Sequence, residues 1–501
     1  MKPILGKECL TDTERRAYEQ MKKSPVKVLQ IGEGNFLRGF FDWMIHSCRK
    51  QGLFSGSIAV IQPRPSGRHK LEQLCRQDGI YTLVIRGMEK GEWVEQRERI
   101  AVFSTLVDPY EDWPGFLAIA EKPELEWVVS NTTEAGLVYQ RMEWNPEKPA
   151  ESFPGKLTHF LYRRYLHFAG DPGKGLILLP CELVDRNGDE LKACVLRHAR
   201  DWGLPGAFLQ WVDCHNRFLN SLVDRIVTGY PHTEAERWFD EWGYRDELLN
   251  TAEPYHFWAI EGEPKLECRL PLRQAGLNVE WVADLRSFQL RKVRILNGAH
   301  TLMAPLGLLY GCSLVREVME HPELSRFVRE TVETEIIPSL PLDQQKMKKY
   351  AKSVFERFAN PCIEHRLSDI VLNSVSKFRV RLLPSLQSFL AEQGRLPQGI
   401  VRALAGLIRF FQVRKEGEEY IGTNLAGQDY TVRDDWEILA FFHAQFAGCS
   451  VRNISQKERV GRILGNERLW GGDLTQVDGL PESVLQHLAR MERGNDVNTR
   501  C

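Results

Sequence analysis

The first 280 or so residues alternate between short apolar runs and longer segments with helical spacing. The segments 35–52 and 67–77 repeat their apolar residues every three or four positions. The runs of strand length are VKVLQIG (26–32), SIAVIQ (57–62), EWVVSN (126–131) and KGLILLPCELV (174–184), and YTLVIRG with WVEQRERIAVFS predicts an inserted hairpin. Short strands that alternate with helices predict an α/β domain built on an open, mainly parallel sheet.

The pattern changes at about residue 284. Long helical periods then follow one another with few strand signals, in VRILNGAHTLMAPLGLLYG, ELSRFVRETVETEIIPSL and IVRALAGLIRFFQ. We therefore predict two domains, an α/β domain over 1–283 and a mainly α-helical domain over 284–501.

Composition narrows the function classes. The 66 Lys and Arg residues nearly cancel the 67 Asp and Glu residues, so no basic surplus indicates nucleic acid or an anionic membrane surface. No apolar run approaches the roughly 20 residues of a membrane-spanning helix, and charge interrupts every apolar run at the N-terminus. Eleven cysteines without any CxxC spacing favour a reduced compartment. We expect a cytoplasmic protein with a small-molecule partner.

The turn after the first predicted strand, GEGNFLRG, indicates a dinucleotide site. Gly32 and Gly34 have the spacing that lets a backbone turn tightly against a pyrophosphate, and Asn35, Phe36 and Leu37 open the following helix. The usual third glycine is absent, because Leu37 occupies its position. The alternative is an ordinary strand-to-helix turn.

The end of the second predicted strand leaves the cofactor open between NAD and NADP. An acid often holds the ribose hydroxyls of NAD at this place, but here the residue is Gln62, followed shortly by Arg64. A neutral glutamine can bind a ribose, and Arg64 can receive a 2′-phosphate or can be a solvated loop charge.

Two further strand ends carry polar side chains. SNTTEAG places Ser130, Asn131 and Thr132 where ligands bind in open α/β sheets, although these residues can also cap a helix. In PCELVDRNGDEL, the pair Asn187-Gly188 predicts a tight turn. Cys181 and Glu182 lack partners at the short fixed intervals of a metal site, so we predict no metal.

RKVRILNGAHT (291–301) mixes polar groups with residues that favour burial. On an α-helix at roughly 100° per residue, His300 lies about 80° and Asn297 about 140° from Lys292, so the three share one side with Leu296 and Met303. A desolvated lysine has a lowered pKa and can act as a general acid or base, while an asparagine amide can stabilise a developing alkoxide. The alternative is a helix with a snorkelling lysine and a core histidine.

With these residues in view, the chain resembles the long-chain, metal-independent mannitol dehydrogenase family over nearly its whole length. SNTTEAG and PCEL resemble the branch that acts on tagaturonate rather than those that act on mannitol or fructuronate. The segments that carry the resemblance are IGEGNFLRGFFDW, VVSNTTEAG, LLPCELVDRNGD, LVDRIVTGYP, VRILNGAHT and RFANPCIEH. The resemblance implies a Rossmann-type domain followed by a helical domain, and NAD as the cofactor although the ribose-binding acid is missing.

The resemblance also implies roles for single residues. The family spacing Lys-x4-Asn-x2-His makes Lys292 the general acid/base, Asn297 the group that polarises the carbonyl, and His300 the group that positions substrate. Asn187 corresponds to a second asparagine of the oxyanion site. Asp224 and Lys377 correspond to substrate-site residues, although Asp224 can instead pair with Arg225 or end a helix.

The activity that the resemblance implies is reversible, NAD-dependent reduction of D-tagaturonate to D-altronate in hexuronate breakdown. The alternatives are a fructuronate or polyol dehydrogenase of the same family, and a catalytically silent NAD-binding protein. The intact Lys292, Asn297 and His300 spacing argues against a silent binding protein, which has no use for a desolvated lysine.

Overall fold

The computed structural model describes residues 2–447 and 455–492. It contains two compact units, one formed by Met1–Glu89 and Trp93–Arg286 and the other by Lys90–Glu92 and Ser287–Cys501. The boundary predicted at residue 283 lies in the short link between strand β13 (Val279–Val282) and helix α10 (Arg286–Arg291).

The first unit is built on a six-stranded sheet of order β5-β2-β1-β6-β7-β8, in which every neighbouring pair is parallel. Its strands are β1 (Val26–Ile31), β2 (Ser57–Ile61), β5 (Phe103–Val107), β6 (Trp127–Ser130), β7 (Ile177–Pro180) and β8 (Arg217–Phe218). The strand order reverses at β1, which lies between β2 and β6, so the carboxyl ends of β1 and β6 flank the switch point. The predicted parallel α/β sheet is confirmed.

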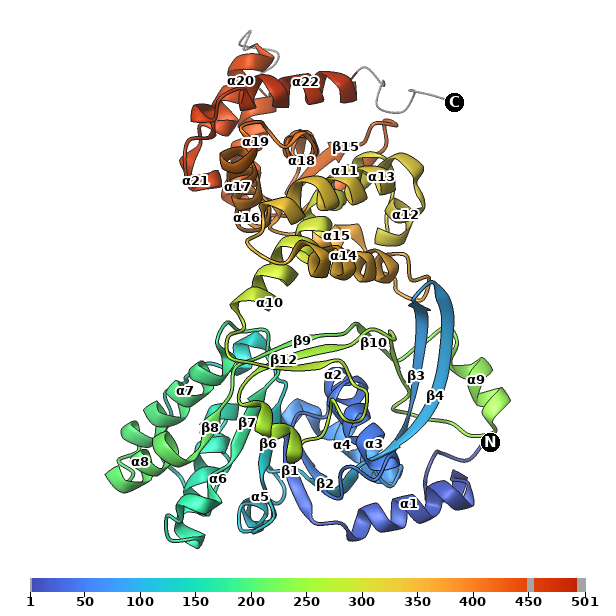
Figure 1. The fold of residues 1–501 in the computed structure, drawn as a ribbon, viewed down its shortest axis with the longest axis vertical. Helices are drawn as coiled ribbons and strands as arrows, with labels where there is room; N and C mark the ends of the chain where they lie inside the picture. Colours follow the sequence, from blue (N-terminus) through green and yellow to red (C-terminus); the bar gives the residue numbers. More distant parts are fainter. Residues whose placement is uncertain (1, 448–454, 493–501) are drawn as a thin grey trace. The chain divides into compact units, whose positions relative to one another are not determined.

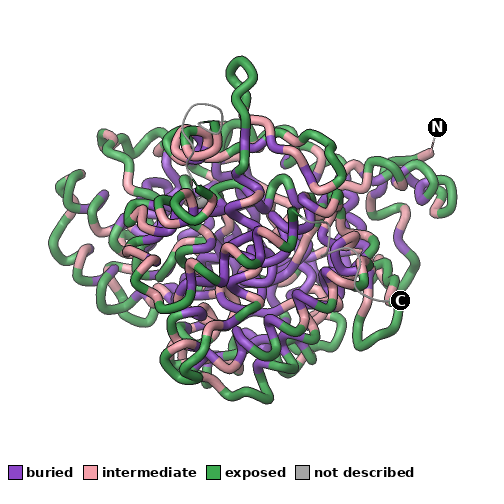
Figure 2. The backbone as a smooth tube through the Cα atoms, turned by 90° about the horizontal axis from the view of Figure 1, so that it is seen from above, coloured by how far each residue is buried: buried purple, intermediate pink, exposed green. Residues whose placement is uncertain are grey.

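Both faces of this sheet are covered, which explains why its strands read as continuous apolar runs. Val28 of β1 belongs to one hydrophobic core, whereas Leu29 and Ile31 of the same strand belong to the core on the opposite face of the sheet. The first core contains α3 (Phe41–Lys50) and α4 (Arg68–Arg76), and the second contains α5 (Trp113–Ile119), α6 (Phe153–His167), α7 (Asn187–Asp201) and α8 (Gly206–His215). Figure 1 shows these helices beside the strands, and Figure 2 shows the buried stretches inside and the exposed ones on outer loops.

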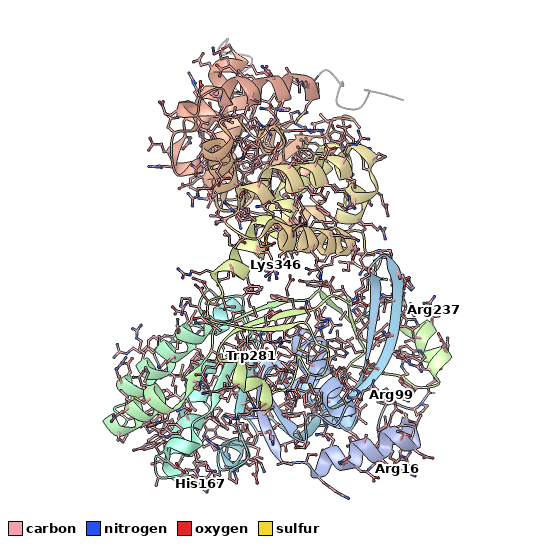
Figure 3. The ribbon with its side chains drawn as sticks, in the orientation of Figure 1. Arg16, Arg99, His167, Arg237, Trp281 and Lys346 are labelled. Atoms are coloured by element: carbon pink, nitrogen blue, oxygen red, sulfur yellow. The ribbon has the colours of Figure 1, made fainter. Side chains whose placement is uncertain are left out.

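Two smaller sheets extend the first unit. The predicted hairpin is formed by β3 (Ile80–Glu89) and β4 (Glu92–Ala101). Together with β11 (Asn250–Ala252) and β10 (Val227–Gly229) it makes a four-stranded sheet of order β10-β11-β3-β4. A three-stranded sheet joins β13, β12 (Phe257–Glu261) and β9 (Ser221–Asp224). Trp281 of β13 is buried there and donates from Nε1 to Glu267 Oε2 at 2.8 Å (Figure 3). Two helices lie outside these layers, α1 (Asp12–Lys23) and α9 (Ala235–Trp242).

The second unit is mainly helical, as predicted. Its central helix, α11 (Gly298–Leu309), is buried along nearly its whole length, and α18 (Gln398–Phe410) packs against it. The other helices are α12 (Val315–Glu320), α13 (Pro322–Thr331), α14 (Gln344–Phe358), α15 (Leu367–Ile370), α16 (Ser374–Arg381), α17 (Leu383–Gln393), α19 (Trp436–Ala447), α20 (Gln456–Leu464), α21 (Glu467–Trp470) and α22 (Leu480–Glu492). No helix in the described part of the chain is long and apolar enough to cross a membrane.

The sequence analysis did not foresee an antiparallel sheet in this unit. It consists of β14 (Val413–Glu416), β15 (Glu419–Thr423) and β16 (Asp429–Val432). Most of its residues are exposed or half-buried, and many are charged. These strands therefore lack the apolar run or regular alternation that reveals a buried strand.

Candidate functional site

The glycine-rich turn between β1 and α2 (Asn35–Gly39) brings the backbone close to the switch point. Gly32 has a φ of +122°, which glycine adopts far more readily than other residues, and its amide donates to Ile61 O at 2.9 Å. A Cβ atom added there would lie 2.9 Å from the carbonyl oxygen of Asn131, at the end of β6. No atom of the described residues lies within 4 Å of the same position at Gly34. One side of the turn is thus open to a pyrophosphate.

A third glycine does exist, two positions later than the usual spacing. A Cβ atom added at Gly39 would lie 2.8 Å from Val227 Cγ1, so this glycine permits close packing of α2 against β10. Leu37, at the usual position, is buried in the core. The glycine of the usual spacing is thus absent, as the sequence shows, and Gly39 permits the close packing instead.

The buried guanidinium of Arg38 holds this turn in place. Its Nε donates to Glu33 O at 3.2 Å, its Nη2 to Asn35 Oδ1 at 2.7 Å, and its Nη1 to the carbonyl of Leu248. Arg38 is only 2% exposed, and burial lowers its pKa. Because three donors of one rigid group bind the turn and a neighbouring segment, the turn is preorganised for its ligand.

The end of β2 carries a side-chain amide that could bind the hydroxyls of a ribose. Gln62 is fully buried, and neither atom of its side-chain amide has a hydrogen-bond partner among the described residues. A buried amide without partners costs free energy, which the hydroxyls of a bound ribose would recover. Arg64 is exposed at the start of the short 3-10 turn Pro65–Gly67.

Glu182 connects the two polar strand ends that the sequence singled out. Its Oε1 accepts from the amide of Thr132 at 2.8 Å and from Thr132 Oγ1 at 3.1 Å, and its Oε2 accepts from Ser130 Oγ at 3.0 Å. Asn131 Nδ2 donates to Cys181 O at 2.9 Å. Burial raises the pKa of Glu182, and these hydrogen bonds oppose that effect. The segment 130–132 is thus fixed beside Gly32, and only a 3-10 turn follows it at Glu134–Gly136.

Asn187 is buried, and both polar atoms of its side-chain amide form hydrogen bonds to backbone groups. Its Nδ2 lies 3.0 Å from the carbonyl oxygens of Pro180, Glu182 and Ser221, and its Oδ1 accepts from the amide of Ser221 at 2.9 Å. These contacts tie the ends of β7 and β9 together. The predicted tight turn at Asn187-Gly188 is wrong, because both residues begin α7 and the left-handed residue is Arg186, with a φ of +48°.

Asp224 is buried at the end of β9, where it lies opposite Phe257 of β12. Its neighbour Arg225 donates to Gly39 O at 2.7 Å and to Glu253 O at 3.0 Å. Since Asp224 ends a strand, the alternative that it ends a helix is wrong.

Lys292–Asn297 form a π-helical turn between α10 and α11. The sequence predicted one continuous α-helix, with about 140° between Lys292 and Asn297. Hydrogen bonds of a π turn join residues five apart, so these two half-buried side chains come closer to one face than an α-helix allows. The prediction of a regular helix is therefore wrong. Single π turns often occur at functional sites.

His300, in the first turn of α11, is buried in an aromatic and cationic environment. Its ring centre lies 4.4 Å from that of Phe358 and 4.7 Å from that of His365. Its Nε2 is buried without a hydrogen-bond partner among the described residues. Burial, and then the neighbouring His365 and Arg357, lowers the pKa of His300 well below its ordinary value. The imidazole is consequently neutral near pH 7, and its buried Nε2 has an unused capacity for one hydrogen bond.

Positive charge surrounds this imidazole. Arg357, Lys377 and Arg381 all act electrostatically on His300. Lys377 donates to Ile370 O at 2.8 Å, and burial followed by the charge of Arg381 lowers its pKa. Arg381 donates to Thr301 Oγ1 at 3.3 Å. A carboxylate is the natural ligand of such a group.

The predicted residues thus fall into two groups. The first unit contains the residues of the glycine-rich turn, Gln62, residues 130–132, Asn187 and Asp224. The second unit contains Lys292, Asn297, His300 and Lys377. Sequence reasoning gave no role to Arg38, Glu182, Arg357, Arg381 or His365. From the sequence, Glu182 was weighed only as a metal ligand. Arg357 and His365 lie within RFANPCIEH, a segment that carries the family resemblance, and this segment was the only sequence signal for these two residues.

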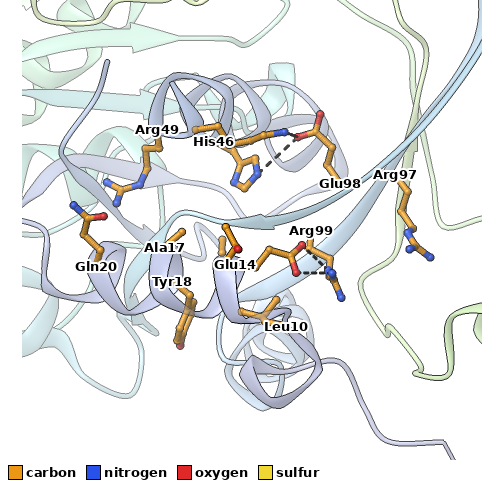
Figure 4. Close-up of a pocket in the computed structure, with 13 residues that line it drawn as sticks. Leu10, Glu14, Ala17, Tyr18, Gln20, His46, Arg49, Arg97, Glu98 and Arg99 are labelled. Carbon is orange, nitrogen blue, oxygen red and sulfur yellow. Dashed lines mark hydrogen bonds and ion pairs between the residues drawn. The ribbon is translucent and has the colours of Figure 1, made fainter. Parts of the chain in front are cut away.

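A separate cavity of about 580 Å³ lies in the first unit among α1, α3 and β4 (Figure 4). The polar and charged side chains that line it largely contact one another. His46 Nε2 and Lys50 Nζ lie 3.7 Å and 3.2 Å from Glu98 Oε2, and Arg99 pairs with Glu14. Burial lowers the pKa of His46 to about 4. This cavity contains none of the predicted site residues.

Within residues 2–447 and 455–492, no three His, Cys, Asp or Glu side chains are grouped in a way that could hold a metal ion. Eight of the described cysteines are thiols rather than halves of a disulfide, namely Cys9, Cys48, Cys75, Cys181, Cys194, Cys214, Cys268 and Cys312.

Two family models match this chain over most of its length. The mannitol dehydrogenase Rossmann domain matches residues 26–274, and the mannitol dehydrogenase C-terminal domain matches residues 284–492. Among curated proteins, the altronate oxidoreductase of Bacillus subtilis (strain 168) is 41% identical over 477 residues, which is 95% of this chain and 94% of the relative. The altronate oxidoreductase of Klebsiella pneumoniae (strain 342) is 41% identical over 94% of this chain and 95% of its own length.

Solved structures show the same fold at low sequence identity. A substrate-free D-sorbitol dehydrogenase superposes with a TM-score of 0.76 at 20% identity, covering 95% of each chain. Mannitol 2-dehydrogenase from Pseudomonas fluorescens, in a ternary complex with NAD and D-mannitol, gives a TM-score of 0.64 at 20% identity, covering 95% of this chain and 94% of its own.

Proposed function

The chain belongs to the mannitol dehydrogenase family and is an NAD-dependent oxidoreductase, and from this premise we propose that it interconverts D-tagaturonate and D-altronate in hexuronate breakdown. The observation that carries the choice of a sugar acid is the set of cations around His300. Arg357, Lys377 and Arg381 suit a substrate carboxylate, which an uncharged polyol lacks. The curated relatives that carry the name altronate oxidoreductase support the same choice.

In the proposed mechanism, bound NADH supplies the hydride and NAD⁺ accepts it in the reverse direction. Lys292 gives a proton to the oxygen of the reduced keto group, and takes it back when altronate is oxidised. Asn297 donates an amide hydrogen to the same oxygen and stabilises its developing negative charge. The neutral imidazole of His300 forms a hydrogen bond to the substrate through Nε2 and orients it.

Asn187 was expected to be a second oxyanion donor. Its amide already contacts three carbonyl oxygens, so in this proposal it positions the ends of β7 and β9, and Asn297 supplies the oxyanion contact. Asp224 and Lys377 remain proposed substrate-site residues.

The test is the rate of NADH oxidation with D-tagaturonate, fructuronate and fructose, before and after prolonged treatment with a chelator. The proposal expects chelator-resistant turnover and a clear preference for tagaturonate. A preference for fructuronate or fructose would assign the chain to another activity of the family, and NADH binding without turnover of any of the three would identify a silent binding protein.

The role of Lys292 is tested with Lys292→Ala. Loss of the general acid should reduce kcat by about 100- to 10,000-fold while NADH binding is retained. Lys346→Ala is the matched control, because Lys346 is an exposed lysine of the same unit (Figure 3). Near-normal turnover by Lys292→Ala would rule out the assignment.

A further inference from the structure

Glu33, the middle residue of Gly32-Glu33-Gly34, has its side chain buried beside Gln62. It is only 6% exposed. A Cβ atom added at Gly67 would lie 2.6 Å from Glu33 Oε1 and 3.1 Å from Gln62 Cβ, so both side chains lie under the turn Pro65–Gly67. The glycine-rich turn thus brings a carboxylate to the end of β2, where a Rossmann-type domain binds the adenosine ribose.

No direct ionic partner balances this carboxylate. Glu33 makes no ion pair among residues 2–447 and 455–492, and the charges that act on it are those of Lys70, Arg38 and Arg64. Arg38 directs its donors to Glu33 O, Asn35 and Leu248 instead. Burial raises the pKa of Glu33, so the ionised form benefits from any hydrogen-bond donor that a ligand brings.

The amide of Gln62 beside it is unsatisfied, because both of its polar atoms lack partners among the described residues. One carboxylate and one amide therefore converge with spare hydrogen-bonding capacity on the same small region. A ribose diol supplies two hydroxyl donors to such a pair and also accepts from the amide.

We propose that Glu33 supplies the carboxylate that binds the ribose hydroxyls of NAD and excludes NADP, in place of the acid that this chain lacks at position 62. The carboxylate accepts hydrogen bonds from the hydroxyls, whereas the 2′-phosphate of NADP would bring negative charge against it. Cofactor selectivity in this chain then resides in the glycine-rich turn rather than at the end of β2.

The test measures the dissociation constants of NADH and NADPH by quenching of tryptophan fluorescence, without substrate. Glu33→Gln keeps the shape of the side chain and removes its charge. Loss of charge-assisted hydrogen bonds should weaken NADH binding by about 10- to 100-fold, and NADPH binding should strengthen. Glu72→Gln is the control, because Glu72 is an exposed acid on nearby α4 and should leave both constants unchanged.

A double variant, Glu33→Gln with Gln62→Glu, returns the acid to the end of β2. It should restore the preference for NADH over NADPH, which a merely structural role of Glu33 does not predict. Unchanged dissociation constants in Glu33→Gln would overturn the proposal. The proposal would also be overturned if Glu33→Gln weakened the binding of NADH and NADPH equally and the double variant did not reverse this loss. A lowered melting temperature in the same variant would then point to a structural role of Glu33. Because no sugar acid is present, the outcome is independent of the proposed substrate.

Discussion

Replacing Lys156 by methionine should stabilise the protein at neutral pH and flatten the rise of its stability at alkaline pH. Lys156 is fully buried on α6, where its ammonium donates to Pro63 O at 3.1 Å and to Glu151 O at 2.9 Å. It also lies 4.8 Å from the ring centre of Tyr110. Burial lowers the pKa of Lys156 from 10.5 to about 7.

The sign follows from proton counting. Between about pH 7 and pH 10.5 the unfolded chain keeps a proton on this lysine that the folded protein releases, so the free energy of unfolding rises with pH in this window. When Lys156 is protonated in both states, the difference between its two pKa values corresponds to about 5 kcal/mol of destabilisation. Raising the pH from 7 to about 10 recovers about 3 kcal/mol of it.

Urea unfolding of wild type, Lys156→Met and Lys148→Met, at pH values from about 7 to 10, measures this effect. Lys148 is exposed and serves as the control. The stability advantage of Lys156→Met at pH 7 should shrink by about 3 kcal/mol at pH 10, whereas Lys148→Met should run parallel to wild type. Parallel curves for Lys156→Met would refute the argument that burial of the ammonium governs this part of the pH dependence.

The remaining predictions concern the turn and strand ends of the first unit. Gly32→Ala places a Cβ atom 2.9 Å from Asn131 O at a φ of +122°, so NADH binding should weaken by about 100-fold, and a titration within threefold of wild type would contradict the close approach. Asn187→Ala leaves buried carbonyls without their donor and should lower the free energy of unfolding by about 2 to 4 kcal/mol. A 100-fold loss of kcat in the folded variant would instead assign Asn187 to the oxyanion site.

The parallel sheet could be predicted because its strands are buried on both faces. Runs such as 26–31 and 57–61 stand out by apolar content alone. The short strands between residues 217 and 282 contain two to five residues each, and the strands of 413–432 are largely exposed, so neither set has a comparable signal. Local pattern detects burial, and it does not detect strands held mainly by pairing with distant segments.

The polar residues of the site show the same limit. Lys292, Asn297 and His300 are close in sequence, so their common side could be inferred, although the π turn that changes their spacing could not. Glu182 binds Ser130 and Thr132 from about 50 positions away, and no local pattern records that contact. The sequence shows that Glu33 lies between two glycines, but it does not show the direction of its side chain. The short distance between Gly67 and the Glu33 carboxylate reveals that direction.

Unsatisfied polar atoms provide a second criterion for ligand contacts, provided that they are combined with position. Several buried side chains of this chain, including Trp127 and Trp258, have a polar atom without a partner among the described residues, so the property alone is not specific. Gln62 and His300 have it at places that strand-end topology and the Lys-x4-Asn-x2-His spacing identify independently. Each unpartnered group costs about 1–3 kcal/mol unless a ligand satisfies it. The two criteria together therefore support the proposals that Gln62 contacts the cofactor and that His300 contacts the substrate.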